Sequence, residues 1–340
     1  MTAPRWAPGA ATGVGSLPGT DPYEAARVVF GELPDLPHLP ELPARGAGAD
    51  MIGRGTAILV DLPVDLQPAG WRLVERPGRD WRRARDFLRR DLDALEEVAL
   101  GYQGPVKIQV AGPWTLAATV ELGRGDKALS DGGAVRDLAA SLAEGVTAQL
   151  ADLRARVPAA DPVVQVDEPL LPAVLAGTVP TASGFGALRA VEATAARGVL
   201  ATVLGAAADA DVPALVHCCA ARPPIDLLCD AGADGLGLDV SGLTARDDDA
   251  IGAAVEAGRS LFLGVVPATD PEVSDRAGTV RAVRVVQALW HRLGLDATRL
   301  AGVVVPTPAC GLAGASPAYA RSALARCREI GRRLREDPEG

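Results

Sequence analysis

The sequence predicts an α/β fold, a single (β/α)8 barrel of the TIM type that spans residues 1–340. Eight short apolar segments alternate with longer amphipathic segments along the chain, as in such a barrel. Several apolar segments, such as VVQV at 163–166 and GVVVP at 302–306, are continuous, which is typical of parallel strands buried on both faces. An open doubly wound sheet is the alternative, and no GxGxxG or Walker-type glycine loop favours its nucleotide-binding form.

The expected elements follow in order. Strands are expected at residues 12–17, 56–61, 106–111, 163–167, 214–217, 235–240, 261–266 and 303–306. Helices are expected at residues 80–100, 133–157, 185–208, 224–231, 246–257, 279–293 and 317–334. An N-terminal extension precedes the first strand. A proline-rich loop at 31–54 follows the first helix, because its prolines exclude a long helix or a central strand.

Composition and charge exclude several classes of protein. The net charge of −9 argues against a general binder of nucleic acid, which needs Lys and Arg to neutralise phosphates. No apolar run of about 18 residues could span a bilayer, and the N-terminus lacks an apolar signal region. We therefore expect a cytoplasmic protein with neither nucleic acid nor membrane as a partner. In a reducing cytosol, its five cysteines favour metal binding, catalysis or core packing over disulfides.

Candidate metal ligands occur where expected strands end, which is where barrel enzymes place their catalytic groups. His217 and Cys219 end the fifth strand, and Cys310 follows the eighth. His217 and Cys219 are two positions apart, so they point to the same side of an extended segment. A His/Cys/Cys set favours zinc and leaves one position open for substrate. Asp239, on a strand between them, could supply a weak oxygen ligand.

Two further groups of candidate site residues lie at strand ends. Asp167 and Glu168 follow the fourth strand. Adjacent carboxylates can fix a substrate ammonium group or act as acid and base, and a helix N-terminal cap is the structural alternative. Gly15 and Ser16 end the first strand, where amides and a hydroxyl could bind a carboxylate; a plain turn is the alternative.

Six motifs run from the first expected strand to the last. They are GSLP at 15–18, AGPWT at 111–115, QVDEPLL at 165–171, HCC at 217–219, GADGLGLD at 232–239 and PACGL at 308–312. With these motifs the chain resembles the catalytic barrel of the cobalamin-independent methionine synthase family, within the uroporphyrinogen decarboxylase/methionine synthase-like superfamily. The resemblance implies a zinc-dependent methyltransferase that moves a methyl group to the thiol of homocysteine and gives methionine.

The resemblance also implies a set of zinc ligands. Zn2+ would be held by His217, Cys219, Cys310 and an acidic residue that corresponds to Asp239. The family usually has Glu at that last position, and the shorter Asp makes the fourth ligand the weakest of the set. Homocysteine would displace it and bind through sulfur, and coordination would convert the thiol to a thiolate at neutral pH.

The resemblance further implies how the amino-acid part of homocysteine is bound. Asp167 would hold its ammonium group and act in catalysis, with Glu168 beside it. Gly15 and Ser16 would hold its carboxylate. Glu41, ahead of the Asp-Met pair at 50–51, matches a further acidic contact of the family.

Two departures from the family bear on the methyl donor. The segment VVPATD at 265–270 lacks the histidine that the family has after its seventh strand. Full-length folate-dependent enzymes also carry a second, N-terminal barrel, and one barrel is expected here. The sequence therefore favours a short "core" relative that takes its methyl group from a corrinoid protein or methylcobalamin. A zinc-dependent alkyltransferase acting on another thiol such as coenzyme M, and a non-catalytic zinc- or corrinoid-binding barrel, stay open as alternatives.

Overall fold

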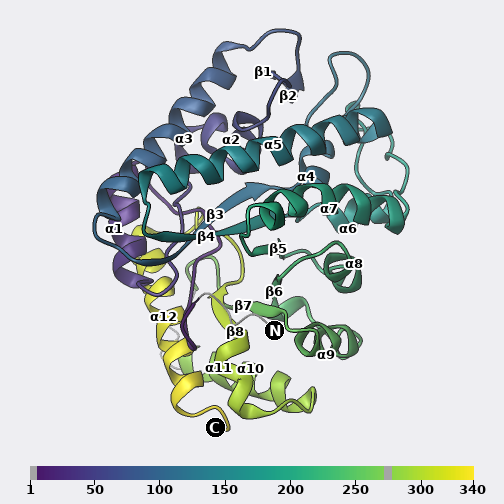
Figure 1. The fold of residues 1–340 in the computed structure, drawn as a ribbon. Coiled ribbons are helices and arrows are strands. Elements are labelled where there is room, and N and C mark those ends of the chain that lie inside the picture. The colour runs from purple at the N-terminus through teal and green to yellow at the C-terminus, as the bar shows by residue number, and fades with distance from the viewer. Residues whose placement is uncertain (1–5, 272–277) are drawn as a thin grey trace.

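A curled sheet of six parallel strands forms the centre of the protein. The computed structural model describes residues 6–271 and 278–340, so the first five residues of the expected N-terminal extension lie outside it. Each strand pairs with the next along the chain, and Figure 1 shows helices around them. The strands are β3 (Gly104–Ala111), β4 (Ala160–Asp167), β5 (Ala214–Cys218), β6 (Gly235–Asp239), β7 (Ser260–Val266) and β8 (Val304–Pro308).

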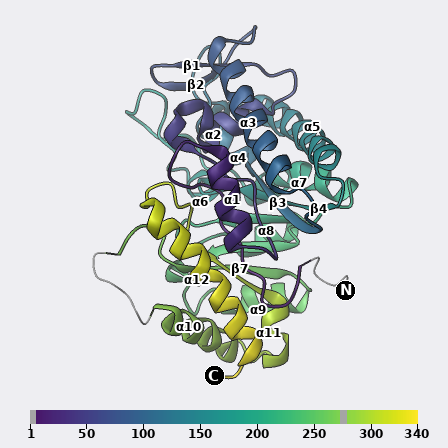
Figure 2. The ribbon, with the colours of Figure 1, turned by 90° about the vertical axis from the view of Figure 1, so that its left-hand side faces the viewer.

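The helices form an outer layer around the sheet. They are α1 (Pro22–Glu32), α2 (Met51–Ala57), α3 (Arg79–Val98), α4 (Pro113–Ala117), α5 (Gly132–Arg156), α6 (Leu171–Ala176), α7 (Ala193–Asp209), α8 (Ile225–Asp230), α9 (Asp248–Glu256), α10 (Gly278–Arg292), α11 (Leu300–Val303) and α12 (Pro317–Glu336). Helix α1 packs against both α3 and α12 (Figure 2), which brings the two ends of the chain's helical layer together. Among the described helices, none combines the length and apolar character needed to cross a membrane.

Local sequence explains where the long helices begin. Asp131 accepts hydrogen bonds from the first amides of α5, and Ser316 caps α12, whose first residue is Pro317. Such residues satisfy amides that have no partner within the helix. The expected helices at 80–100, 133–157 and 317–334 are present, whereas α7 begins at residue 193 instead of 185. A hairpin of β1 (Val64–Gln67) and β2 (Gly70–Leu73) was not expected from the sequence.

Two extended N-terminal segments lie between the edge strands β8 and β3. The Thr12 amide donates to the Pro306 carbonyl oxygen of β8 at 3.2 Å. Ser16 forms an isolated parallel bridge with Glu41, and His38 forms another with Lys107 of β3. The fold is therefore TIM-barrel-like, with six strands in the sheet and isolated bridges in place of two further strands.

The structure corrects the first two expected strands. The segment at 12–17 is extended but carries only an isolated bridge. A strand at 56–61 is wrong, because Thr56 and Ala57 end helix α2. A short apolar run does not distinguish a strand from a buried helix end. Part of the proline-rich loop lies beside β3 instead: prolines lack an amide proton, but Leu39 and Glu41 between them donate to Lys107 and Gly15.

Side chains inside the curled sheet change from apolar at one end to polar at the other. Positions two apart on a strand share a face, so Val163, Gln165 and Asp167 of β4 follow one another along the interior. Val163 belongs to a small apolar cluster in which the Trp6 ring packs edge-on against Phe262 at 5.3 Å between centroids. The polar end is formed by the C-terminal ends of the strands.

Candidate metal centre and amino-acid site

Three potential metal ligands meet at the C-terminal end of the sheet. His217 lies on β5, Cys219 follows it, and Cys310 follows β8. One ligand atom of each lies within 4.8 Å of the other two, and the two Sγ atoms are 3.5 Å apart. Within residues 6–271 and 278–340 this is the one group of three or more His, Cys, Asp or Glu side chains so close together.

The surroundings of His217 fit a metal ligand. The side chain is buried, and its Nε2 atom has no hydrogen-bond partner in the described part of the chain. Such an atom is costly to bury unless something binds it. Gly237, its partner on β6, leaves space for the ring, because a Cβ there would lie 2.8 Å from Nδ1. Imidazole and thiolates together are the ligand set that zinc favours.

The two thiols are close enough to form a hydrogen bond with each other. The hydrogen bond with Cys219, and then the neighbouring His217 side chain, lower the pKa of Cys310 to about 4. The same contact with Cys310, followed by burial, raises the pKa of Cys219. Two adjacent thiolates repel each other unless a cation neutralises them, so this pair has the chemistry of a metal site.

Asp239 ends β6 but is not a member of this group of three. Its Oδ1 atom accepts a hydrogen bond from the Ser241 amide at 2.9 Å. The fourth zinc ligand therefore stays a prediction.

Asp167 and Glu41 are buried carboxylates near the cluster. Asp167 is the register partner of His217 and accepts a hydrogen bond from Gln165 Nε2 at 2.7 Å. Burial raises its pKa to about 7. Burial also raises the pKa of Glu41, whose Oε1 lies 3.6 Å from Arg54 Nε. An incoming cation such as an ammonium group would find two carboxylates here.

Gly15 and Ser16 lie between Glu41 and the metal cluster. The Glu41 amide donates to the Gly15 carbonyl oxygen at 3.1 Å. Ser16 touches the loop of Cys310, because a Cβ on Gly311 would lie only 2.1 Å from Ser16 Oγ. The structure thus brings the predicted carboxylate-binding segment next to the predicted zinc ligands.

Glu168 has the contacts of a helix cap. It is fully buried. Its oxygens accept hydrogen bonds from the Trp114 amide at 2.9 Å and from the amide and hydroxyl of Thr115 at 2.8 and 2.7 Å. Burial raises its pKa to about 7. These bonds tie β4 to the start of α4, and a role in binding substrate stays a prediction.

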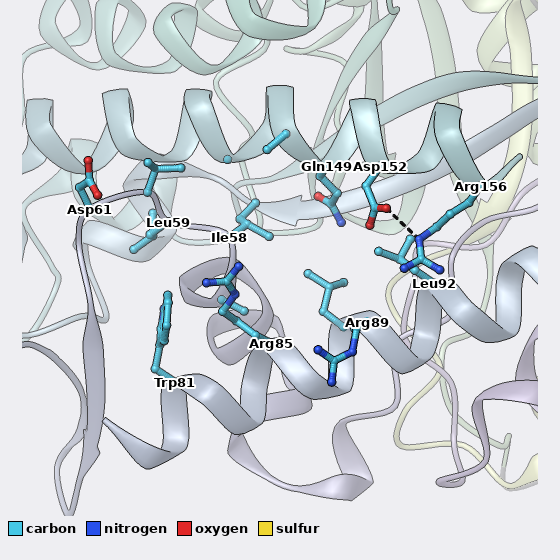
Figure 3. A pocket seen from close by; sticks show the side chains of 15 residues that line it. Ile58, Leu59, Asp61, Trp81, Arg85, Arg89, Leu92, Gln149, Asp152 and Arg156 are labelled. Atoms are coloured by element: carbon cyan, nitrogen blue, oxygen red, sulfur yellow. Dashed lines mark hydrogen bonds and ion pairs between the residues drawn. The ribbon is translucent and has the colours of Figure 1, made fainter. Parts of the chain in front are cut away.

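A separate cavity of about 500 Å³ lies between α3 and α5 (Figure 3). Its lining includes Trp81, Arg85, Arg89 and Gln149. None of the predicted site residues lines it, so this cavity is distinct from the metal cluster.

The sequence did not lead us to the buried polar residues that contact the carboxylates of the site. Gln109 and Gln165 are buried and contact Glu41 and Asp167. Their signal was present in the sequence as a single glutamine between apolar residues in each of two strands, IQV at 108–110 and VQV at 164–166. Gly237 lies in the GADGLGLD motif, but the motif alone does not show that the missing side chain leaves space for the His217 ring.

The fold and the cluster define a TIM-barrel-like α/β protein with a candidate thiolate metal centre at the C-terminal ends of its strands. The family model described as cobalamin-independent synthase, catalytic domain, matches residues 9–333. The chain belongs to this family, the cobalamin-independent methionine synthases, which confirms the resemblance seen in the sequence.

A solved structure supports the fold. A B12-independent methionine synthase from Shewanella sp. W3-18-1, in complex with selenomethionine, is similar with a TM-score of 0.60 and 12% identity over 97% of this chain and 99% of that one. A glycoside hydrolase family 20 β-N-acetylglucosaminidase scores 0.48 at 16% identity, over 95% of this chain and 70% of that one. At 12% identity, the similarity to the Shewanella enzyme concerns the fold alone. No curated protein matches the chain.

Proposed function

We propose that this protein is a zinc-dependent methyltransferase that moves a methyl group to the thiol of homocysteine and gives methionine. Membership of the cobalamin-independent methionine synthase family supports the methylation of homocysteine. The observation that supports a bound zinc ion is the cluster of His217, Cys219 and Cys310. The buried Nε2 atom of His217 lacks a hydrogen-bond partner among the described residues.

The chain's own residues would hold zinc and substrate side by side. His217, Cys219 and Cys310 would bind the metal, with Asp239 as the proposed fourth ligand. Zn2+ bound there would supply one kind of chemistry: it would lower the pKa of the substrate thiol, so that the thiolate would be present at neutral pH.

Binding and orientation would fall to the groups around the cluster. Asp167, next to His217 in the sheet, would hold the ammonium group of homocysteine, and Glu41 would add a second negative charge. Ser16 and Gly15, beside the Cys310 loop, would hold the carboxylate. Both charged groups of the amino acid would thus be held in place, and the substrate thiol would face the metal cluster.

The corrinoid donor that the sequence favoured has no support in the comparisons. The family and the Shewanella enzyme are both described as independent of cobalamin. We therefore propose homocysteine as the acceptor and zinc as the metal. The following assay identifies the methyl donor.

A methionine assay with three donors tests the proposal. Zinc-loaded protein and homocysteine would be incubated with methyltetrahydrofolate, its polyglutamate or methylcobalamin, and methionine would be measured. Methionine formation that stops after chelation and returns with Zn2+ supports the function. Activity that ignores chelators would overturn the role of zinc, and tighter binding of coenzyme M than of homocysteine by calorimetry would overturn the acceptor.

A further inference from the structure

Lys107 is a fully buried cation in the interior of the sheet. It lies on β3, and the proposed function gives it no task. Its Nζ atom donates to Gln165 Oε1 at 2.7 Å, to the Val14 carbonyl oxygen at 3.1 Å and to Gln109 Oε1 at 3.4 Å. An ammonium group has three protons to donate, and three acceptors surround this one.

The two glutamines extend these contacts to two carboxylates. Gln165 Nε2 donates to Asp167 Oδ1 at 2.7 Å. Gln109 Nε2 donates to Glu41 Oε1 at 3.3 Å, and also to the Leu39 carbonyl oxygen at 2.8 Å. Each glutamine therefore turns its carbonyl oxygen to Lys107 and its amide nitrogen to an acidic side chain.

The chemistry of the groups fixes this arrangement. A lysine ammonium only donates hydrogen bonds, and a carboxylate only accepts them. If the Gln165 amide were turned round, its NH2 group would face Lys107 and its oxygen would face Asp167, so two attractive contacts would become repulsive. The same holds for Gln109 between Lys107 and Glu41. Lys107 thus helps to determine which atom of each glutamine faces the acidic side chain, together with the Val14 and Leu39 carbonyl oxygens, which also accept hydrogen bonds from the two amide nitrogens.

Lys107 also balances the charge of this interior. Burial lowers the pKa of Lys107 to about 7, while the charges of Asp167 and Glu41 act to raise it. Its bond to Val14 holds the residue that precedes Gly15 and Ser16. One side chain therefore contacts, directly or through one glutamine, every segment proposed to bind the amino-acid end of the substrate.

We propose that Lys107 is a positioning residue of this amino-acid site. Through Gln165 and Gln109 it orients the Asp167 and Glu41 carboxylates, so that they bind the substrate ammonium group beside the metal cluster. The inference rests on the proposed function, because it assumes that an amino acid with a thiol is bound there.

Binding of two thiols to Lys107→Met tests this role. Methionine keeps most of the length and volume of lysine but donates no hydrogen bond. Zinc-loaded wild type and variant would be titrated by calorimetry with homocysteine and with 2-mercaptoethanol, which lacks both amino-acid groups. Because hydrogen bonds to charged groups would be lost, homocysteine affinity should fall at least about tenfold. Zinc content and affinity for 2-mercaptoethanol should not change.

The outcomes separate this inference from the function on which it rests. Wild-type binding of homocysteine with equal binding by the variant would overturn the role of Lys107 alone. An equal loss of affinity for both thiols would show that Lys107 has only a structural role. A zinc-loaded wild type that binds no homocysteine would overturn the proposed function itself.

Gln165→Glu tests the connection from Lys107 through Gln165 to Asp167 if the Lys107 variant does not fold. Its carboxylate still accepts a hydrogen bond from Lys107 but cannot donate to Asp167. Homocysteine affinity should fall at least about tenfold while 2-mercaptoethanol binds as before. Gln103→Glu, which adds the same charge at an exposed position, is the matched control and should bind homocysteine like wild type. Unchanged homocysteine binding by Gln165→Glu would count against the proposal.

Discussion

The Sγ atoms of Cys219 and Cys310 lie 3.5 Å apart, although 91 positions separate the residues in the chain. They follow strands β5 and β8, and β6 and β7 lie between these in the sheet. A flat sheet would hold the ends of β5 and β8 about 14 Å apart at the usual strand spacing. The curl of the sheet is therefore what makes the thiol pair possible.

Cys310→Ser should remove most of the bound zinc. Three protein ligands define a site of this kind, so loss of one thiolate should lower bound zinc from about one equivalent to a small fraction of that. Metal analysis of the purified protein after dialysis measures it. Cys229→Ser on α8, outside the cluster, is the control and should keep its zinc. A Cys310 variant with a full equivalent of zinc would contradict the assignment.

Gly237→Ala should weaken zinc binding without removing a ligand. The new Cβ would lie 2.8 Å from His217 Nδ1 and 3.1 Å from its Cα, so either the ring or the strand must move. Changes beside a metal ligand commonly cost about 10- to 100-fold in metal affinity, and competition with a coloured chelator would measure the loss.

Gly198→Ala on α7 is the matched control for that substitution. A Cβ at Gly198 meets no atom within 4 Å among the described residues. Zinc affinity should stay at the wild-type value, and the helix should gain about 0.5–1 kcal/mol of stability. Equal zinc affinities for the two alanine variants would show that His217 tolerates the crowding, and the steric argument would then fail.

Much of the fold could be predicted because buried parallel strands carry a strong pattern. The six central strands and the long helices follow from continuous apolar runs and amphipathic segments. The N-terminal part could not be predicted in the same way. The run at 56–61 has strand composition, yet Thr56 and Ala57 end helix α2. Leu39 and Glu41 take a strand-like place through isolated hydrogen bonds only, and no local pattern indicates such pairing.

The candidate site shows the same division. His217 and Cys219 could be paired from their spacing, because alternate residues of a strand share a face. Cys310 could be added to the pair because the strands before Cys219 and Cys310 were predicted to end at the same rim of a barrel. The network from Lys107 through Gln165 to Asp167 depends on which strands are neighbours and in what register, and one sequence does not contain that information.

His38 should make the protein less stable in acid. Burial, with the nearby charge of Lys107, lowers the pKa of His38 from 6.5 to about 3 in the folded protein. Between these values the unfolded chain binds a proton that the folded chain does not, so the free energy of unfolding falls as the pH falls from 6.5 towards 3. His38→Leu should remove this part of the pH dependence.

Urea unfolding at several pH values measures the effect of His38. Leucine leaves no orphaned acceptor, because the Leu39 carbonyl oxygen still receives the Gln109 amide. His291→Leu, at an exposed position of α10, is the control and should keep the wild-type slope. The hypothesis fails if the slope of unfolding free energy against pH is the same in His38→Leu and wild type.

Asp167→Asn should separate substrate recognition from metal binding. Asparagine keeps the shape of the side chain, and its oxygen can still accept the bond from Gln165, but the negative charge that would face the ammonium group is gone. Homocysteine affinity of the zinc-loaded protein should fall at least about tenfold, which corresponds to about 1.4 kcal/mol or more. Coenzyme M, which has no ammonium group, should bind the variant at least as well as wild type. Calorimetry with both thiols decides the question. A parallel loss of affinity for the two thiols would mean that Asp167 supports the metal cluster and does not bind the ammonium group of the substrate.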